Sequence, residues 1–231
     1  MAFTAKDVQA LREKTGVGMM DCKKALVASD GDMDKAIDFL REKGLAAATK
    51  KASRIAAEGV VLAYYDESKK VGVVVEVNSE TDFVAKNEKF TSFVSDIAKT
   101  IVETAPADVD ALNATKLVGS DKTVEEMRQE LVLAIGENMK VRRFERVEGQ
   151  IATYIHGGGT VGVLVQFDTD DATAATDAFK AMGKDVAMQI AAMNPEYLSK
   201  DCISDDELAK MKSITIDSSL NKPDTLPKPI L

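Results

Sequence analysis

The sequence has no tryptophan, one histidine and two cysteines among its 231 residues. Cys22 and Cys202 are far apart, and together with His156 they do not provide the ligand spacing of a zinc site. A serine–histidine–aspartate triad would depend on His156 alone, so the composition disfavours metal-dependent and triad hydrolases. Two distant cysteines also indicate a reducing compartment and no disulfide framework.

The sequence also shows no long apolar run and no secretion signal, and it has few aromatic residues. No window approaches 18 apolar residues, and the N-terminal residues MAFTAKDVQALREK have no apolar stretch after a basic one. We therefore expect a cytoplasmic protein that has no membrane partner. Aromatic residues make up only 5%, so Val, Ile, Leu, Ala and Met must build the core. The net charge of −8 opposes direct contact with nucleic-acid phosphates.

Helical signals dominate residues 1–45. Thr4 is a predicted N-cap with Asp7 three residues later, and Asp32 is a predicted cap for a third short helix. Gly44 is expected just past the end of that helix. Three short helices in so few residues can enclose a core only as a compact three-helix bundle.

The hydrophobic period changes after residues 46–57, which are Ala-rich and basic and are expected to form a helical linker. Residues 60–65 and 71–77 are β-branched runs that predict a β-hairpin. A predicted helix over 87–103 follows, and residues 140–148 alternate apolar and charged side chains like a strand with one solvated face.

A second hairpin resembles the first. Residues 150–156 and 160–167 are its predicted strands, separated by three glycines, and a helix is expected over 172–193. A shift of 90 residues without gaps aligns Gly59 with Gly149, Tyr64 with Tyr154, Gly72 with Gly162 and Val73 with Val163. An internal duplication explains this match, and chance similarity between two Val-rich hairpins is the alternative.

These patterns predict an α+β fold in which two duplicated subdomains, each a small antiparallel sheet covered by helices, follow the bundle. The second hairpin has no candidate third strand, and residues 213–231 hold three prolines and no completed periodic element. We therefore expect a truncated second subdomain or a disordered tail. The expected parts are a bundle over 1–45, a linker over 46–57, subdomains over 58–148 and 149–195, and a tail over 196–231.

The segment NSETDFVAK, residues 78–86, lies between a predicted strand and a predicted helix, where binding residues are common. Phe83 could be a core residue at this corner, with Thr81 or Asp82 capping the helix. Alternatively, Phe83 projects into a pocket of a partner, because a buried Phe contributes about 1.5–3 kcal/mol of transfer free energy.

Two further places have open interpretations. Gly157 to Gly159 precede a strand, which indicates a hairpin turn rather than a phosphate loop, and His156 beside them is expected to be a loop or contact residue. Cys22, Met19 and Met20 could belong to the bundle core, whereas exposed methionines would suit a deformable contact surface.

Four segments carry a resemblance to a known family. LREKTGVGMMDCKKAL at 11–26, EVNSETDFVAKNEKF at 76–90, IGENMKVRR at 135–143 and YIHGGGTVGVLV at 154–165 closely resemble the elongation factor Ts family. The resemblance implies a ubiquitin-associated-like N-terminal bundle and a duplicated core. It also implies a coiled-coil insertion after Pro195, through which a full-length protein could form a homodimer.

The resemblance further implies a guanine-nucleotide exchange factor whose partner is the GTPase elongation factor Tu. Thr81, Asp82, Phe83 and Val84 would disturb the magnesium site that holds GDP on that partner, so that GDP leaves and GTP binds. Further contacts would come from two other places, namely Arg12, Met19 and Met20 in the bundle and His156 and Gly157 at the glycine turn. The chain itself would need no cofactor or metal and would perform no covalent chemistry.

One alternative from another class stays open. The chain could be a non-catalytic adaptor whose bundle binds partner helices without promoting exchange. An enzyme is a more distant alternative, because the sequence offers no combination of base, nucleophile and orienting group.

Overall fold

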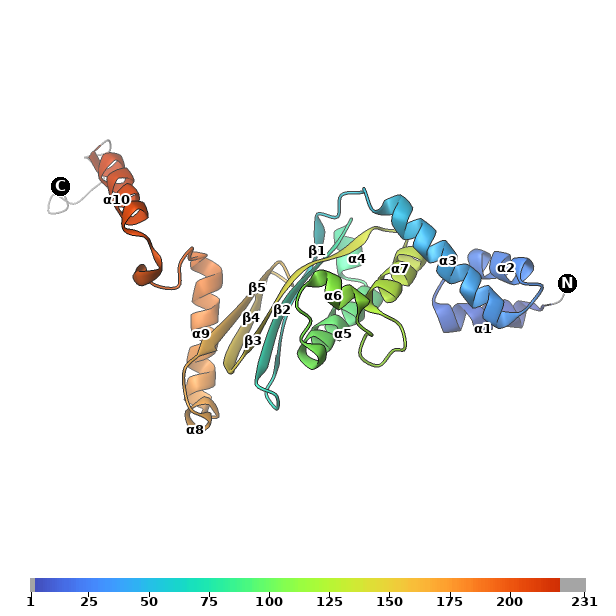
Figure 1. Ribbon diagram of the computed structural model, residues 1–231, viewed down its shortest axis with the longest axis horizontal. Coiled ribbons are helices and arrows are strands. Elements are labelled where there is room, and N and C mark those ends of the chain that lie inside the picture. Colours follow the sequence, from blue (N-terminus) through green and yellow to red (C-terminus); the bar gives the residue numbers. More distant parts are fainter. Residues whose placement is uncertain (1–2, 221–231) are drawn as a thin grey trace. The chain divides into compact units, whose positions relative to one another are not determined.

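The computed structural model describes residues 3–220 (Figure 1). Contacts divide the chain into two compact units, one ending at Ala192 and one beginning at Met193. N-terminal helices followed by small antiparallel sheets with helical cover confirm the predicted α+β class. None of the helices within residues 3–220 combines the length and apolar character that a membrane span requires.

The N-terminal bundle consists of α1 (Ala5–Thr15), α2 (Met19–Ala28) and α3 (Met33–Lys51). Thr4 and Asp7 form the predicted capping box, and Asp32 accepts hydrogen bonds from the first-turn amides of α3. The bundle encloses a small core of its own, made of Val8, Leu11, Val17, Cys22, Ala25, Leu26, Ala36 and Leu40.

The third helix does not end at Gly44, so the prediction of a C-terminal cap there was wrong, and residues 46–51 of the expected helical linker continue this helix. α3 continues to Lys51 and packs against α7 (Val124–Ile135). A Cβ atom on Gly44 would lie 3.3 Å from the backbone oxygen of Gln129, so the glycine allows the two helices to approach closely. Ala48, only four residues further, lies in the next hydrophobic core.

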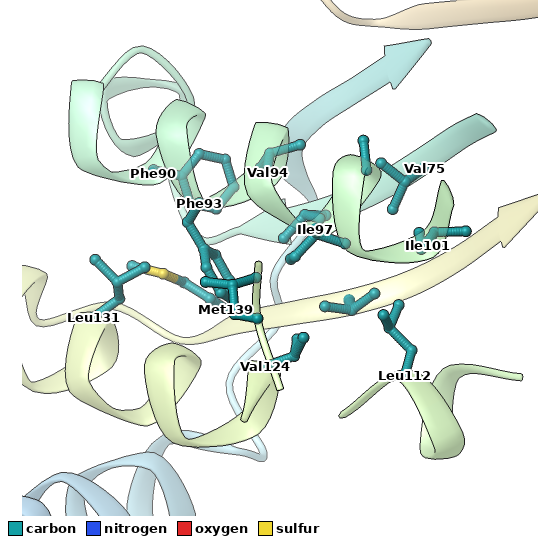
Figure 2. Close-up of a cluster of buried hydrophobic side chains, with 14 of the residues drawn as sticks. Val75, Phe90, Phe93, Val94, Ile97, Ile101, Leu112, Val124, Leu131 and Met139 are labelled. Atoms are coloured by element: carbon teal, nitrogen blue, oxygen red, sulfur yellow. The ribbon is translucent and has the colours of Figure 1, made fainter. Parts of the chain in front are cut away.

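That next core lies under a three-stranded antiparallel sheet with the order β1-β2-β3. Its strands are β1 (Glu58–Asp66), β2 (Val71–Ser79) and β3 (Met139–Glu148), which confirms the predicted hairpin and third strand. One face of the sheet is covered by α5 (Glu88–Thr104), α6 (Val109–Ala114) and α7 (Figure 1). Figure 2 shows the buried side chains between these layers, among them Val75, Phe90, Phe93, Val94, Ile97, Ile101, Leu112, Val124, Leu131 and Met139.

A second sheet packs on the opposite face of the first. β4 (Gln150–His156) and β5 (Val161–Phe167) form the predicted second hairpin. A Cβ on Gly72 would lie 2.8 Å from Ile151 and 2.9 Å from Leu164, and a Cβ on Gly162 would lie 2.5 Å from Val61 and 3.1 Å from Val74. These two sets of contacts are equivalent under the 90-residue shift, so the hairpins pack reciprocally, as two copies related by a two-fold axis would.

The helical cover of the second sheet is broken where one helix was expected over 172–193. Instead α8 (Asp171–Ala174) ends and α9 (Asp177–Met193) begins. Asp170 accepts a hydrogen bond from the amide of Thr173, and the hydroxyl of Thr176 accepts one from the amide of Phe179. Each of these side chains starts its own helical segment, because short polar side chains compete for backbone amides.

The second unit contains a short 3₁₀ turn (Lys200–Cys202) and α10 (Asp205–Leu220). The expectation that residues 213–231 hold no completed element was wrong for 213–220, which belong to α10. The hydroxyl of Ser204 accepts a hydrogen bond from the amide of Glu207, and acidic residues occupy the first turn, where they favour a helix. Residues 221–231, with all three prolines of the tail, lie outside the described residues.

Candidate functional site

Phe83 lies on α4 (Asp82–Ala85), a single helical turn next to β1 (Figure 1). Its side chain is 80% exposed, whereas the adjacent Val84 is only 6% exposed and belongs to the main core. The alternative in which Phe83 is a core residue is therefore wrong, because Val84 fills the corner instead. An exposed phenylalanine beside a buried anchor can bind an apolar pocket on another molecule.

Hydrogen bonds between two loops fix the segment before Phe83, and their acceptors are the carboxylates of Glu80 and Glu137. The side chain of Glu80 accepts a hydrogen bond from the amide of Asn138 at 2.6 Å. In return, the carboxylate of Glu137 accepts one from the amide of Thr81 at 3.0 Å and another from its hydroxyl at 2.8 Å. We call Glu80, Thr81, Glu137 and Asn138 the reciprocal clamp.

Further hydrogen bonds, made with Arg54 and Ser79, hold the residues of the reciprocal clamp. The guanidinium of Arg54 donates to Glu80 at 3.2 Å, and Asn138 donates from its side chain to the backbone oxygen of Arg54 at 2.8 Å. The hydroxyl of Ser79 donates to the backbone oxygen of Thr81. Asn138 is 6% exposed, so its polar groups are largely removed from water and depend on these partners.

Glu76 of β2, four residues before Glu80, binds two consecutive arginines of β3. A bulge between β2 and β3 places both Arg142 and Arg143 opposite Glu76, and each donates a hydrogen bond to its carboxylate. Burial acts to raise the pKa of Glu76, but hydrogen bonds from Arg143, Asn78 and Arg142 outweigh it and lower the pKa below the usual value. Glu76 therefore stays ionised and ties the end of β2 to β3.

Asp82, next to Phe83, is exposed and forms an ion pair with Lys86 at 2.8 Å. The hydrogen bond from Lys86 lowers the pKa of Asp82. The negative charge is thus present at neutral pH, but an exposed pair of this kind contributes little to stability. Asp82 is consequently free in energetic terms to exchange Lys86 for a partner.

The three predicted contact residues of the bundle are all exposed. Met19 and Met20, at the start of α2, are 42% and 63% exposed, and Arg12 lies on the outer face of α1. Arg12 and Met19 line one cleft together with Lys89 of α5. Cys22, in contrast, is a core residue, and burial raises the pKa of its thiol. The methionines therefore fit the contact-surface interpretation, and the cysteine fits the core interpretation.

His156 and Gly157 lie at the turn of the second hairpin and are exposed. The Nδ1 atom of His156 is 3.1 Å from the hydroxyl of Tyr154, which holds the ring beside the strand. Gly159 accepts a hydrogen bond from the amide of Val61 at 2.7 Å, so the turn is docked on the first sheet. The glycines have φ angles of 60°, 68° and 105°, as a tight hairpin turn requires.

The predicted site residues thus lie on three separate elements, α4, the bundle and the second turn. Within residues 3–220, no group of three or more His, Cys, Asp and Glu side chains could hold a metal ion. Sequence reasoning missed Arg54, Glu80, Glu137 and Asn138. The signal was available in part, because three of these four residues belong to the segments that carried the resemblance, but nothing in the sequence joins those segments.

Comparison with known proteins places the chain among translation elongation factors. The family model described as Elongation factor TS matches residues 80–231. A protein from Clostridium perfringens named Elongation factor Ts is 50% identical over 223 residues, which cover 95% of this chain and 72% of that protein. Proteins of the same name from Clostridium kluyveri (49% identical; 99% and 76% covered) and Syntrophotalea carbinolica (46% identical; 100% and 77% covered) are also similar. The chain belongs to the elongation factor Ts family.

Proposed function

We propose that this chain binds the GDP-bound form of elongation factor Tu and promotes the release of GDP, so that GTP can bind. The observation that carries the proposal is Phe83, an 80% exposed aromatic side chain on a segment held by the reciprocal clamp. A fixed apolar side chain can enter a pocket of a GTPase without first losing conformational freedom. Membership of the elongation factor Ts family supports the choice of partner.

The proposed mechanism is a coupling between two binding events and involves no covalent chemistry. Burial of Phe83 in the partner provides about 1.5–3 kcal/mol of transfer free energy, which is enough to displace a nearby element. Magnesium bound to phosphates requires near-octahedral oxygen ligands, so a small displacement of its surroundings weakens the hold on GDP. Thermodynamic reciprocity then requires that GDP weakens the binding of this chain by the same factor.

The other exposed residues supply binding rather than displacement. Arg12, Met19 and Met20 would contact the nucleotide-binding domain of the GTPase, and His156 with Gly157 would contact another of its domains. Methionines suit such a surface because the unbranched side chain adapts to irregular shapes. Asp82 would act beside Phe83, where Lys86 can release it at little cost.

The test is the release of labelled GDP from elongation factor Tu, timed with and without this chain. We expect Phe83→Ala to reduce the release rate severalfold and to leave the unfolding temperature unchanged, because the side chain makes few internal contacts. Leu198→Ala, which removes a 97% exposed apolar side chain from the second unit, is the matched control. A chain that binds the GTPase without accelerating release would support the adaptor alternative, and normal exchange by folded Phe83→Ala would refute insertion of Phe83.

A further inference from the structure

We infer that Glu80 and Glu137 are positioning residues for exchange, because their carboxylates set the direction in which Phe83 projects. The inference rests on the proposed function and names residues that do not themselves need to touch the partner. Its starting point is the reciprocal clamp, in which each carboxylate accepts a backbone amide of the opposite loop.

The helical turn that carries Phe83 cannot hold itself. α4 has four residues, and a single turn is not stable without tertiary support. Thr81 occupies the N-cap position, yet its side chain makes no capping hydrogen bond to α4. Both the hydroxyl and the amide of Thr81 donate instead to Glu137. The start of α4 is therefore fixed from outside the helix.

The opposite loop is a firm support. Gly136 ends α7 in a left-handed conformation, and Met139 begins β3 with its side chain fully buried in the main core. Glu137 and Asn138 are the only two residues between these anchors. Hydrogen bonds to ionised carboxylates are also stronger than those between neutral groups, especially where solvent access is limited. The side chain of Glu80 is 20% exposed, which meets that condition.

The two carboxylates act on different parts of the segment. Glu137 accepts a hydrogen bond from Thr81, two residues before Phe83. Glu80 lies on the same segment as Phe83 and accepts hydrogen bonds from the amide of Asn138 and from Arg54. Loss of either carboxylate leaves Val84 buried but frees the start of α4 to rotate about Val84. We therefore expect Glu80→Ala and Glu137→Ala to keep the fold and to loosen Phe83.

The absence of tryptophan from the sequence gives a direct readout. Phe83→Trp places a single tryptophan at an exposed position, and its anisotropy, excited selectively over the tyrosines in the full chain, reports the mobility of the segment without any partner. We expect Glu80→Ala and Glu137→Ala to lower this anisotropy. Glu88→Ala, which removes an exposed acidic side chain five residues from Phe83, is the matched control and should not change it.

The second readout is exchange, measured in chains that retain Phe83. At saturating concentrations of the chain, Glu137→Ala should lower the maximal GDP-release rate by about three- to tenfold, which is the size of the net contribution of a typical hydrogen bond. The concentration for half-maximal effect should change less, because the bundle and the second turn are untouched. Glu137→Gln keeps one acceptor oxygen and should be intermediate.

The outcomes separate the two proposals. Unchanged anisotropy in folded Glu80→Ala and Glu137→Ala chains that carry Phe83→Trp would overturn the positioning role. Full exchange activity of a carboxylate variant that makes position 83 mobile would overturn it as well. If the anisotropy falls but the parent chain does not accelerate GDP release, the clamp orients the segment and the proposed function has failed. If Glu137→Ala does not fold, a mobile segment in folded Glu137→Gln supports the role, and an unchanged one overturns it.

Discussion

At the residue scale, the direction of one side chain decides whether the segment after β2 can bind. Phe83 and Val84 are neighbouring apolar residues, and the sequence alone does not say which one is buried. The single turn of α4 points Val84 into the core and Phe83 into solvent. Sequence pattern could locate this segment between a strand and a helix, but the choice between the two side chains depends on how α4 lies on the sheet.

Asp21 offers a test of the contacts that support Met19 and Met20. The hydrogen bond from Lys43 of α3 lowers the pKa of Asp21 on α2, and both side chains are 35% exposed. A lowered carboxyl pKa in the folded state stabilises the protein above the unfolded pKa of about 4, and this stabilisation is lost as the pH falls through the folded value.

We therefore expect Asp21→Asn to be less stable than the parent chain at pH 7 by less than about 1 kcal/mol, since the pair is partly exposed. The difference should shrink as the pH falls below about 4. Urea unfolding at several pH values measures it, with Glu42→Gln on the exposed face of α3 as the control. A difference that persists unchanged at low pH would mean that the contribution of Asp21 is not its charge.

At the element scale, the two hairpins meet through glycines that take equivalent places. Gly72 lies against Ile151 and Leu164, and Gly162 lies against Val61 and Val74. We expect Gly72→Ala and Gly162→Ala each to destabilise the chain by about 1–3 kcal/mol, the usual cost of inserting a methyl group into a packed interface.

A compensating substitution tests that explanation. Ile151→Ala removes the two γ-carbons of Ile151 that would lie 2.8 Å and 3.2 Å from a Cβ on Gly72. Ile151→Ala should therefore cost less stability in the Gly72→Ala background than in the parent chain, and it should cost no less in the Gly162→Ala background. Chemical denaturation of the single and double variants gives the coupling energy. An equal effect of Ile151→Ala in both backgrounds would show that the two glycines are not matched to separate partners.

The elements that sequence patterns located well are those whose signals are local. Thr4 and Asp7 form the predicted capping box, because donor and acceptor are three residues apart. Gly44 misled the prediction because glycine has two uses, ending a helix and allowing close packing, and only α7 shows which applies. The reciprocal clamp was beyond reach for the same reason, since it joins residues 56 and 58 positions apart.

At the scale of the whole molecule, the two sheets differ in how many strands protect them. β2 lies between β1 and β3, whereas within residues 3–220 β5 pairs only with β4. The second sheet is not isolated, as its face packs on the first, but an edge strand leaves alternate backbone groups without strand partners.

Hydrogen exchange followed amide by amide should therefore separate the sheets. We expect the amides of Val161 to Phe167 to exchange much faster than those of Val71 to Val77, because β5 opens at lower cost. The strands β1 and β4, which both lie at sheet edges, provide an internal comparison. Equal protection of β2 and β5 would mean that a further element covers the free edge of β5.

The continuity of α3 has a consequence for how this chain would meet a partner. Leu40 and Ala48 lie on the same helix but in different hydrophobic cores, so the bundle and the clamp are parts of one body. If Met19 and Met20 bound a partner, Phe83 would reach it at a distance set by the geometry of α3 and not by a flexible linker, as in a chelate. The rotational entropy of the second contact is then lost during folding and not during association. A flexible insertion in α3 would weaken the complex without removing any contact.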